Sequence, residues 1–170
     1  MKIACVSSSN RGETDQVLSE VAVDLAKSGS ALAGIVKEQT YTSQHDNGCD
    51  MKVRVLPNGP VIKITQDLGA GSDACRLDPG AIAEAVARVE SQPAANADLF
   101  ILNKFGPEEI AGRGFVSAIG NAVEQNIPVL DGVGGANQDA FAAFTGGAVE
   151  TLPADRYSIL AWCREAMNHA

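Results

Sequence analysis

Residues 2–14 read Lys2-Ile3-Ala4-Cys5-Val6-Ser7-Ser8-Ser9-Asn10-Arg11-Gly12-Glu13-Thr14. A short apolar run is followed by a turn-rich segment, and apolar residues then recur at helical spacing from Val17 to Leu25. This order predicts a strand, a loop and a helix. Gly29 stands where a glycine commonly follows a helix, and residues 31–36 have the composition of a second buried strand.

The pattern changes between residues 50 and 66. Val53 and Val55 alternate with charged residues, Pro57-Asn58-Gly59 follows, and a second β-rich run begins at Val61. Asn-Gly between two β-rich runs is a strong signal for a hairpin. We therefore expect an inserted β-hairpin over about residues 50–66.

Strands and helices alternate along the remaining chain. Strands are expected at residues 98–105, 127–130 and 148–152, and helices at 115–123 and 138–144 and after Asp78 and Asp155. The run 99–102 is the most continuously apolar, which indicates the middle strand of a sheet covered on both faces. The alternation predicts an α/β fold, a three-layer, doubly wound and mainly parallel sheet, in a single domain over residues 1–170.

The composition of the chain disfavours nucleic acid and membranes as binding partners. The chain has 170 residues, a formal net charge of -8 and a pI near 4.7, which disfavours nucleic acid because binding to its backbone needs clustered Lys and Arg. No stretch approaches the ~18 apolar residues of a membrane helix, and the apolar start is too short for the core of a signal peptide. We therefore expect a cytoplasmic protein whose four widely spaced cysteines remain thiols.

The loop after the first strand is similar to a phosphate-binding P-loop, which reads G-x-x-x-x-G-K-[ST] between a strand and a helix. The corresponding window here is Ser7-Ser8-Ser9-Asn10-Arg11-Gly12-Glu13-Thr14. Gly12 and Thr14 are in register, whereas Ser7 replaces the first glycine and Glu13 replaces the lysine.

We expect all eight residues of this window to line an anion site built from backbone N–H groups and hydroxyls, with Arg11 supplying positive charge. Glu13 would repel a bound phosphate by about 1 kcal/mol or more where solvent screening is incomplete. The loop therefore suits a small tetrahedral oxyanion better than tightly bound ATP. The alternative is that a Ser-rich turn only caps the helix.

The end of the run 99–105 is the second candidate site. Walker-type enzymes place an acidic residue there to hold Mg²⁺ or its water, but this chain has Asn103 and Lys104, which we retain as ligand-binding candidates. Glu108 and Glu109 are the candidate catalytic residues, since either could polarise a water if a metal is bound. The alternative is ordinary negative charge in the first turn of a helix.

Two further groups could bind a ligand. Arg76 and Arg113 stand in expected loops near the carboxyl ends of strands, where each would clamp an anion or form a surface ion pair. His45, Cys49 and Cys75 have metal-ligand chemistry, although the ligand spacing of a tetrahedral zinc site is absent. The two cysteines are alternatively packed small hydrophobes or a redox pair.

Several motifs carry a resemblance to a known family. They are Cys49-Asp50-Met51, Ile64-Thr65-Gln66-Asp67-Leu68-Gly69, Cys75-Arg76-Leu77-Asp78-Pro79-Gly80, Asn103-Lys104-Phe105-Gly106, Gly112-Arg113-Gly114-Phe115 and Phe144-Thr145-Gly146-Gly147. Together they resemble, nearly end to end, the bacterial domain family of unknown function DUF2478, whose genes often lie beside genes for molybdate transport and molybdenum enzymes.

That family in turn resembles a diverged branch of the small P-loop nucleoside-triphosphatases. These proteins also insert a hairpin after the second strand and carry an acidic-acidic-x-Gly-Pro-x-Glu segment. Residues 103–109 occupy this segment and keep Gly106, Pro107 and Glu109, but lack the two leading acids.

The resemblance and these departures together imply a nucleotide- or oxyanion-binding accessory or sensor protein of molybdenum metabolism that does not hydrolyse its ligand. The implied ligand is a nucleotide, phosphate or molybdate, with Mg²⁺ only if a nucleoside triphosphate binds. The implied protein partner is a second copy of the chain or a protein of the molybdenum pathway. Two alternatives stay open: a slow nucleoside-triphosphatase that uses Arg11 and Glu109, and a protein-interaction domain without a ligand.

Overall fold

The computed structural model describes residues 2–43, 50–66, 76–92 and 96–168. Within these residues seven strands form one sheet in the order β4-β3-β2-β7-β8-β1-β9. Their bounds are β1 (Ile3–Val6), β2 (Leu32–Lys37), β3 (Lys52–Val55), β4 (Val61–Lys63), β7 (Leu99–Phe105), β8 (Val129–Val133) and β9 (Glu150–Leu152). The five strands from β2 to β9 in this order pair in parallel, whereas β3 and β4 are antiparallel, so the α/β fold with an inserted hairpin is confirmed.

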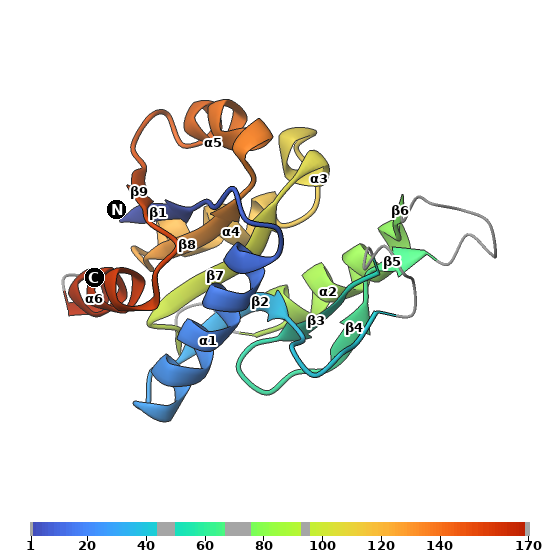
Figure 1. Cartoon of the computed structure of the whole chain (residues 1–170), viewed down its shortest axis with the longest axis horizontal. Coiled ribbons are helices and arrows are strands. Elements are labelled where there is room, and N and C mark those ends of the chain that lie inside the picture. The colour runs from blue at the N-terminus through green and yellow to red at the C-terminus, as the bar shows by residue number, and fades with distance from the viewer. Residues whose placement is uncertain (1, 44–49, 67–75, 93–95, 169–170) are drawn as a thin grey trace.

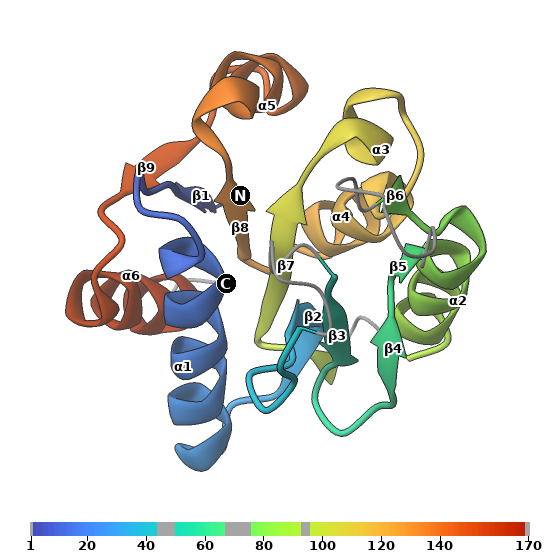
Figure 2. The same ribbon diagram turned by 45° about the vertical axis from the view of Figure 1, so that its right-hand side comes forward.

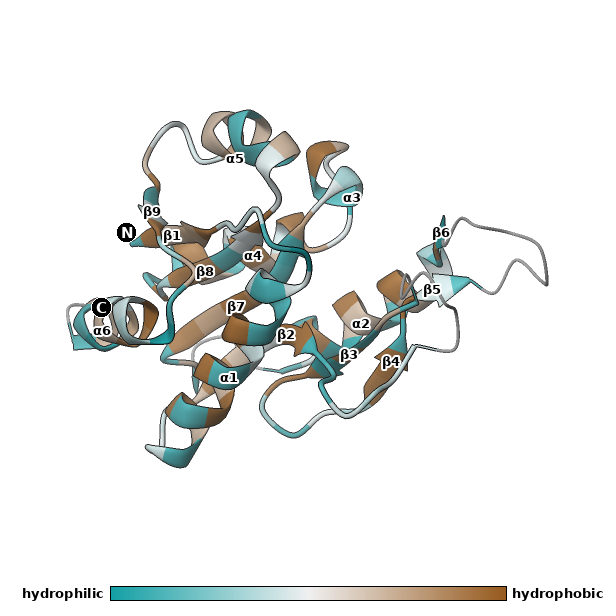
Figure 3. Ribbon diagram, in the orientation of Figure 1, coloured by the Kyte–Doolittle hydropathy of each residue, from teal (hydrophilic) through white to brown (hydrophobic). Residues whose placement is uncertain are grey.

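Helices cover both faces of the sheet (Figures 1 and 2), as a three-layer fold requires. The α-helices are α1 (Glu13–Lys27), α2 (Pro79–Glu90), α3 (Pro107–Ile110), α4 (Val116–Glu124), α5 (Gln138–Phe144) and α6 (Arg156–Asn168). Within the described residues the core divides into two clusters, one under α1 and α6 and the other under α2 and α4. Figure 3 shows hydrophobic and hydrophilic stretches alternating along α1, as expected of a helix with one buried face.

Strand β7 lies in the middle of the sheet, as its continuous apolar run predicted. All its residues except Lys104 are buried. Its carboxyl end and those of β1 and β2 open onto the same edge of the sheet, which is where open α/β sheets bind ligands. None of the described helices is long and apolar enough to cross a membrane.

Three details differ from the expectations. Strand β8 ends at Val133 and not at residue 130, because Asp131 is buried between two neighbouring strands although a charged residue there suggests a strand end. The hairpin turns over residues 56–60, a connection longer than the two-residue turn that Asn-Gly suggests. A small second sheet of β5 (Thr65–Gln66) and β6 (Arg76–Leu77) was not expected. Helix α3 does carry Glu108 and Glu109 in its first turn, in agreement with the alternative interpretation of these two residues.

Candidate functional site

The first part of the candidate site is the loop between β1 and α1. Gly12 immediately precedes α1 and has a φ of 79°, a left-handed conformation that glycine adopts without strain. A Cβ atom at this position would meet nothing within 4 Å, so the backbone conformation and not a lack of space favours glycine. The expected strand, tight turn and helix are therefore present, and the first N–H groups of α1 have no intrahelical acceptors.

Glu13 occupies this loop with its own negative charge. Its carboxylate accepts a hydrogen bond from the Ser8 hydroxyl and another, over 3.1 Å, from the Asn10 side-chain amide. The backbone N–H of Asn10 donates to the Ser8 hydroxyl over 3.0 Å. The side chains of Ser8 and Asn10, which we expected to bind an anion, therefore already donate to a carboxylate of the chain itself. Ser9, Arg11 and other residues at the tip of the loop are exposed.

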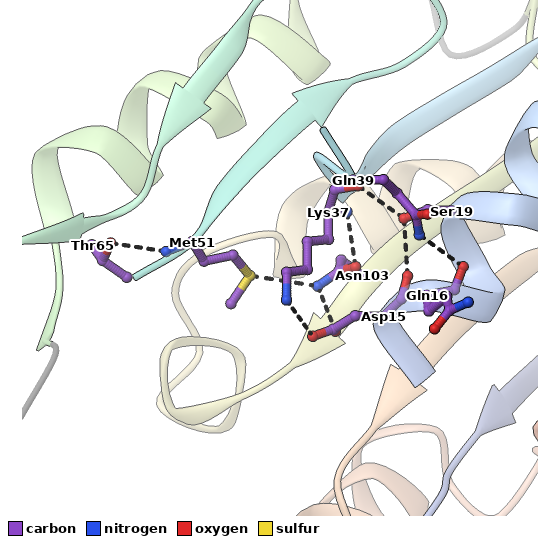
Figure 4. A network of polar contacts seen from close by, with 8 residues as sticks. All are labelled: Asp15, Gln16, Ser19, Lys37, Gln39, Met51, Thr65 and Asn103. Atoms are coloured by element: carbon purple, nitrogen blue, oxygen red, sulfur yellow. Dashed lines mark hydrogen bonds and ion pairs between the residues drawn. The ribbon is translucent and has the colours of Figure 1, made fainter. Parts of the chain in front are cut away.

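Asn103, at the end of β7, is buried and belongs to a polar network (Figure 4). Its amide donates to Asp15 over 3.0 Å and lies 3.8 Å from the Met51 sulfur, and its carbonyl accepts the Lys37 backbone N–H over 3.0 Å. The Lys37 ammonium lies 3.8 Å from the other Asp15 oxygen. Asn103 thus joins β7 to β2 and to the first turn of α1, and its oxygen and nitrogen are both used within the protein.

The same network reaches further along α1. The Ser19 hydroxyl lies 2.9 Å from the carbonyl oxygens of both Asp15 and Lys37, and the Gln39 amide donates to the Gln16 carbonyl over 3.1 Å. Figure 4 shows these contacts fastening α1 along the end of β2. The position of the loop Ser7–Thr14 is consequently fixed by side chains outside the loop.

Glu109, a candidate catalytic residue, braces the loop that follows β7. Its buried carboxylate accepts the backbone N–H groups of Gly106 over 3.0 Å and Phe115 over 3.1 Å. Burial raises the pKa of Glu109 above its ordinary value, although these two hydrogen bonds oppose the shift. Both oxygens are engaged with the backbone, which favours a structural role over the activation of water.

Glu108 and Arg113 form an exposed ion pair, with two hydrogen bonds of 2.9 and 3.1 Å. The Arg113 hydrogen bond holds the pKa of Glu108 below its usual range. The surface-pair interpretation of Arg113 is therefore the one that the geometry favours. Lys104 is exposed on β7, and Arg76 is exposed on β6.

Asp131, on β8, is the residue that sequence reasoning missed. It is wholly buried, and neither carboxyl oxygen has a hydrogen-bond partner within the part of the chain that the structure describes. It lies beside Cys5 of β1 and Leu102 of β7 in the sheet. Burial, with a contribution from the charge of Glu109, raises its pKa well above the ordinary value. A lone acidic residue inside the apolar run 127–133 was the available signal.

The proposed metal ligands His45, Cys49 and Cys75 lie outside the described residues. Within those that are described, no three His, Cys, Asp or Glu side chains are grouped so that they could hold a metal ion. Cys5 and Cys163, the described cysteines, are buried free thiols.

Comparisons with known proteins agree with this architecture. The chain is 34% identical over 169 residues to the protein called molybdenum import ATP-binding protein ModC 2 of Bradyrhizobium diazoefficiens, but it spans only 18% of that relative's length. A solution structure of a human cancer-related nucleoside triphosphatase has the same fold, with a TM-score of 0.60 at 10% identity, covering 99% of this chain and 97% of that one.

The comparison with family models assigns most of the chain to one family. The family described as "Protein of unknown function (DUF2478)" matches residues 3–162, which include the loop, the polar network and Asp131. The chain belongs to this family.

Proposed function

We propose that the chain binds a nucleotide or a small oxyanion at the loop Ser7–Thr14 without hydrolysing it efficiently, as an accessory or sensor protein of molybdenum metabolism in the cytoplasm. The observation that carries the proposal is the turn at Gly12, which presents the start of α1 to the carboxyl edge of the sheet. Backbone N–H groups at such a helix start attract anions. The name of the relative, molybdenum import ATP-binding protein ModC 2, supports the choice of ligand and pathway.

The residues at three positions support binding without turnover. Glu13 stands where P-loops carry lysine, so the cation that stabilises transferring phosphate is missing from that position. Asn103 and Glu109, which would supply oxygens for Mg²⁺ or its water, direct those oxygens at backbone N–H groups. These residues therefore fit a magnesium ion poorly.

The role of Glu13 suggests the sharpest test of anion binding. Calorimetric titration with phosphate, molybdate, ATP and GTP at fixed ionic strength should detect binding of at least one of them to the wild type. The substitution Glu13→Gln should tighten binding about fivefold, since it removes roughly 1 kcal/mol of repulsion. The control Glu84→Gln, on the exposed surface of α2, makes the same change in net charge and should have little effect.

A second candidate, a protein-interaction domain without a ligand, is favoured by one observation. The Glu13 carboxylate already accepts the Ser8 hydroxyl and the Asn10 amide, so these two donors are used within the chain. Absence of heat with all four anions, in both the wild type and Glu13→Gln, would leave this candidate standing. Steady phosphate release from ATP or GTP that Glu109→Gln abolishes would instead establish a slow nucleoside-triphosphatase.

A further inference from the structure

A separate cavity of about 230 Å³ opens at the carboxyl edge of the sheet, between β7, the hairpin strands and α2. Apolar side chains dominate its wall, namely Ile35, Val53, Ile64, Ile82, Leu102 and Phe115. An enclosed cavity of about 150 Å³ lined by such residues accommodates benzene. The larger space here would accommodate a flat molecule of two fused rings.

The described lining residues of this cavity include three charged side chains, Lys104, Glu108 and Glu109, in different surroundings. Glu108 is neutralised by Arg113, through hydrogen bonds of 2.9 and 3.1 Å. Glu109 is buried and accepts two backbone N–H groups. Lys104 also lines the cavity, and it forms no ion pair with any residue that the structure describes. Among the described lining residues, its ammonium is the charge left for a ligand to meet.

A lysine at the rim of an apolar cavity can contact a ligand in two ways. Its apolar stem can cover bound hydrocarbon while the ammonium stays at the solvent boundary, where it attracts an anion. Pockets of this kind, apolar inside with few polar groups at the mouth, select ligands by shape and orient them by charge. We propose that the cavity binds a small, flat, mainly apolar molecule with one anionic group, which lies against Lys104.

This proposal does not depend on anion binding at the loop Ser7–Thr14, because none of the loop residues lines the cavity. The probes are naphthalene-2-carboxylate and its uncharged counterpart naphthalene-2-carboxamide, which have nearly the same shape. Ligand-observed NMR titrations of the full chain should show that the carboxylate binds more tightly than the amide. Ser8→Ala should leave both titrations unchanged.

Two substitutions test the two halves of the proposal. Lys104→Met should weaken binding of the carboxylate about five- to tenfold and change binding of the amide less than twofold. Lys27→Met, which removes the same charge from the far end of α1, should affect neither probe. Ile82→Trp should abolish binding of both by filling the cavity, with native circular dichroism as the check on folding; should it fail to fold, the Lys104 comparison decides.

The proposal is overturned if neither probe binds the folded wild type. It is also overturned if the carboxylate and the amide bind equally, or if Lys27→Met weakens the carboxylate as much as Lys104→Met does, because the charge of Lys104 would then have no specific effect.

Discussion

Asp131 is an acidic residue buried in surroundings that disfavour its charged form. Its carboxyl group lies in the middle of the sheet without a hydrogen bond from any described residue, so the charged form is strongly disfavoured. Burial raises its pKa well above the ordinary range. The folded protein therefore retains this proton at pH values at which the unfolded chain, with an Asp pKa of ~3.9, has lost it.

This difference predicts how stability changes with pH. Because the folded state keeps this proton longer, the contribution of Asp131 to the free energy of unfolding should fall as pH rises above ~4, by as much as ~1.4 kcal/mol per pH unit until Asp131 ionises. Asp131→Asn should flatten this decline, and its advantage over the wild type should grow with pH. Urea unfolding between pH 4 and 8 measures both curves. Parallel curves would show that Asp131 titrates alike in both states.

Gly114 lies so close to the carboxylate of Glu109 that a side chain at this position would clash with it. Its φ is 58°, and a Cβ atom there would lie 2.2 Å from a Glu109 oxygen. Gly114→Ala should destabilise the fold by about 2–4 kcal/mol, since it adds a clash to an unfavourable backbone conformation. Gly112→Ala is the matched control, with a φ of 74° and nothing within 4 Å of its Cβ, and should cost only about 1–2 kcal/mol.

The comparison of these two glycine variants, in the same denaturant titration, isolates the contact with Glu109. Equal losses for Gly112→Ala and Gly114→Ala would mean that the loop after β7 moves to admit a methyl group, and that Glu109 does not brace it.

At the scale of elements, Asn103 couples β7 to β2 and α1. Asn103→Ala would leave the Lys37 backbone N–H without its acceptor and Asp15 without its amide donor. We expect a loss of about 2 kcal/mol in the free energy of unfolding and faster hydrogen exchange at the Lys37 amide. The control Asn121→Ala, on the exposed face of α4, should change neither by a measurable amount. Unchanged exchange at Lys37 in Asn103→Ala would mean that water replaces the amide.

At the scale of the whole molecule, the sheet separates two buried clusters, and each contains one described thiol. Cys5 belongs to the cluster under α2 and α4, and Cys163 to the cluster under α1 and α6. Burial raises the pKa of Cys163 to about 12, so its reactive thiolate is scarce at neutral pH. Both thiols should report on unfolding.

In a variant in which Cys49 and Cys75 are replaced by serine, neither remaining thiol should react with a thiol reagent at pH 7 within minutes. Both should react at once in concentrated urea, and slow labelling under native conditions should follow the rate or free energy of opening. Mass spectrometry assigns each label to Cys5 or Cys163. Rapid native labelling at either position would show that its cluster opens independently of global unfolding.

The sequence by itself determined the elements and the class of fold. Local patterns carry this information, because the period of apolar residues and the residues of turns and caps act within a few positions of the chain. The apolar run 99–102 identified the middle strand, and Asp78 was identified as the cap of α2, where it accepts the N–H groups of Gly80 and Ala81. Gly12 and Thr14 located the turn before α1 for the same reason.

Only the tertiary structure decided which of the candidate side chains remain available to a ligand. Glu13 turns back to the donors of its own loop, Asn103 joins three elements, Glu109 binds the backbone of a later loop, and Lys104 is left without an ion pair among the described residues. These outcomes depend on contacts between segments as many as 88 positions apart, such as Asn103 with Asp15, to which the local pattern of the chain contributes no signal.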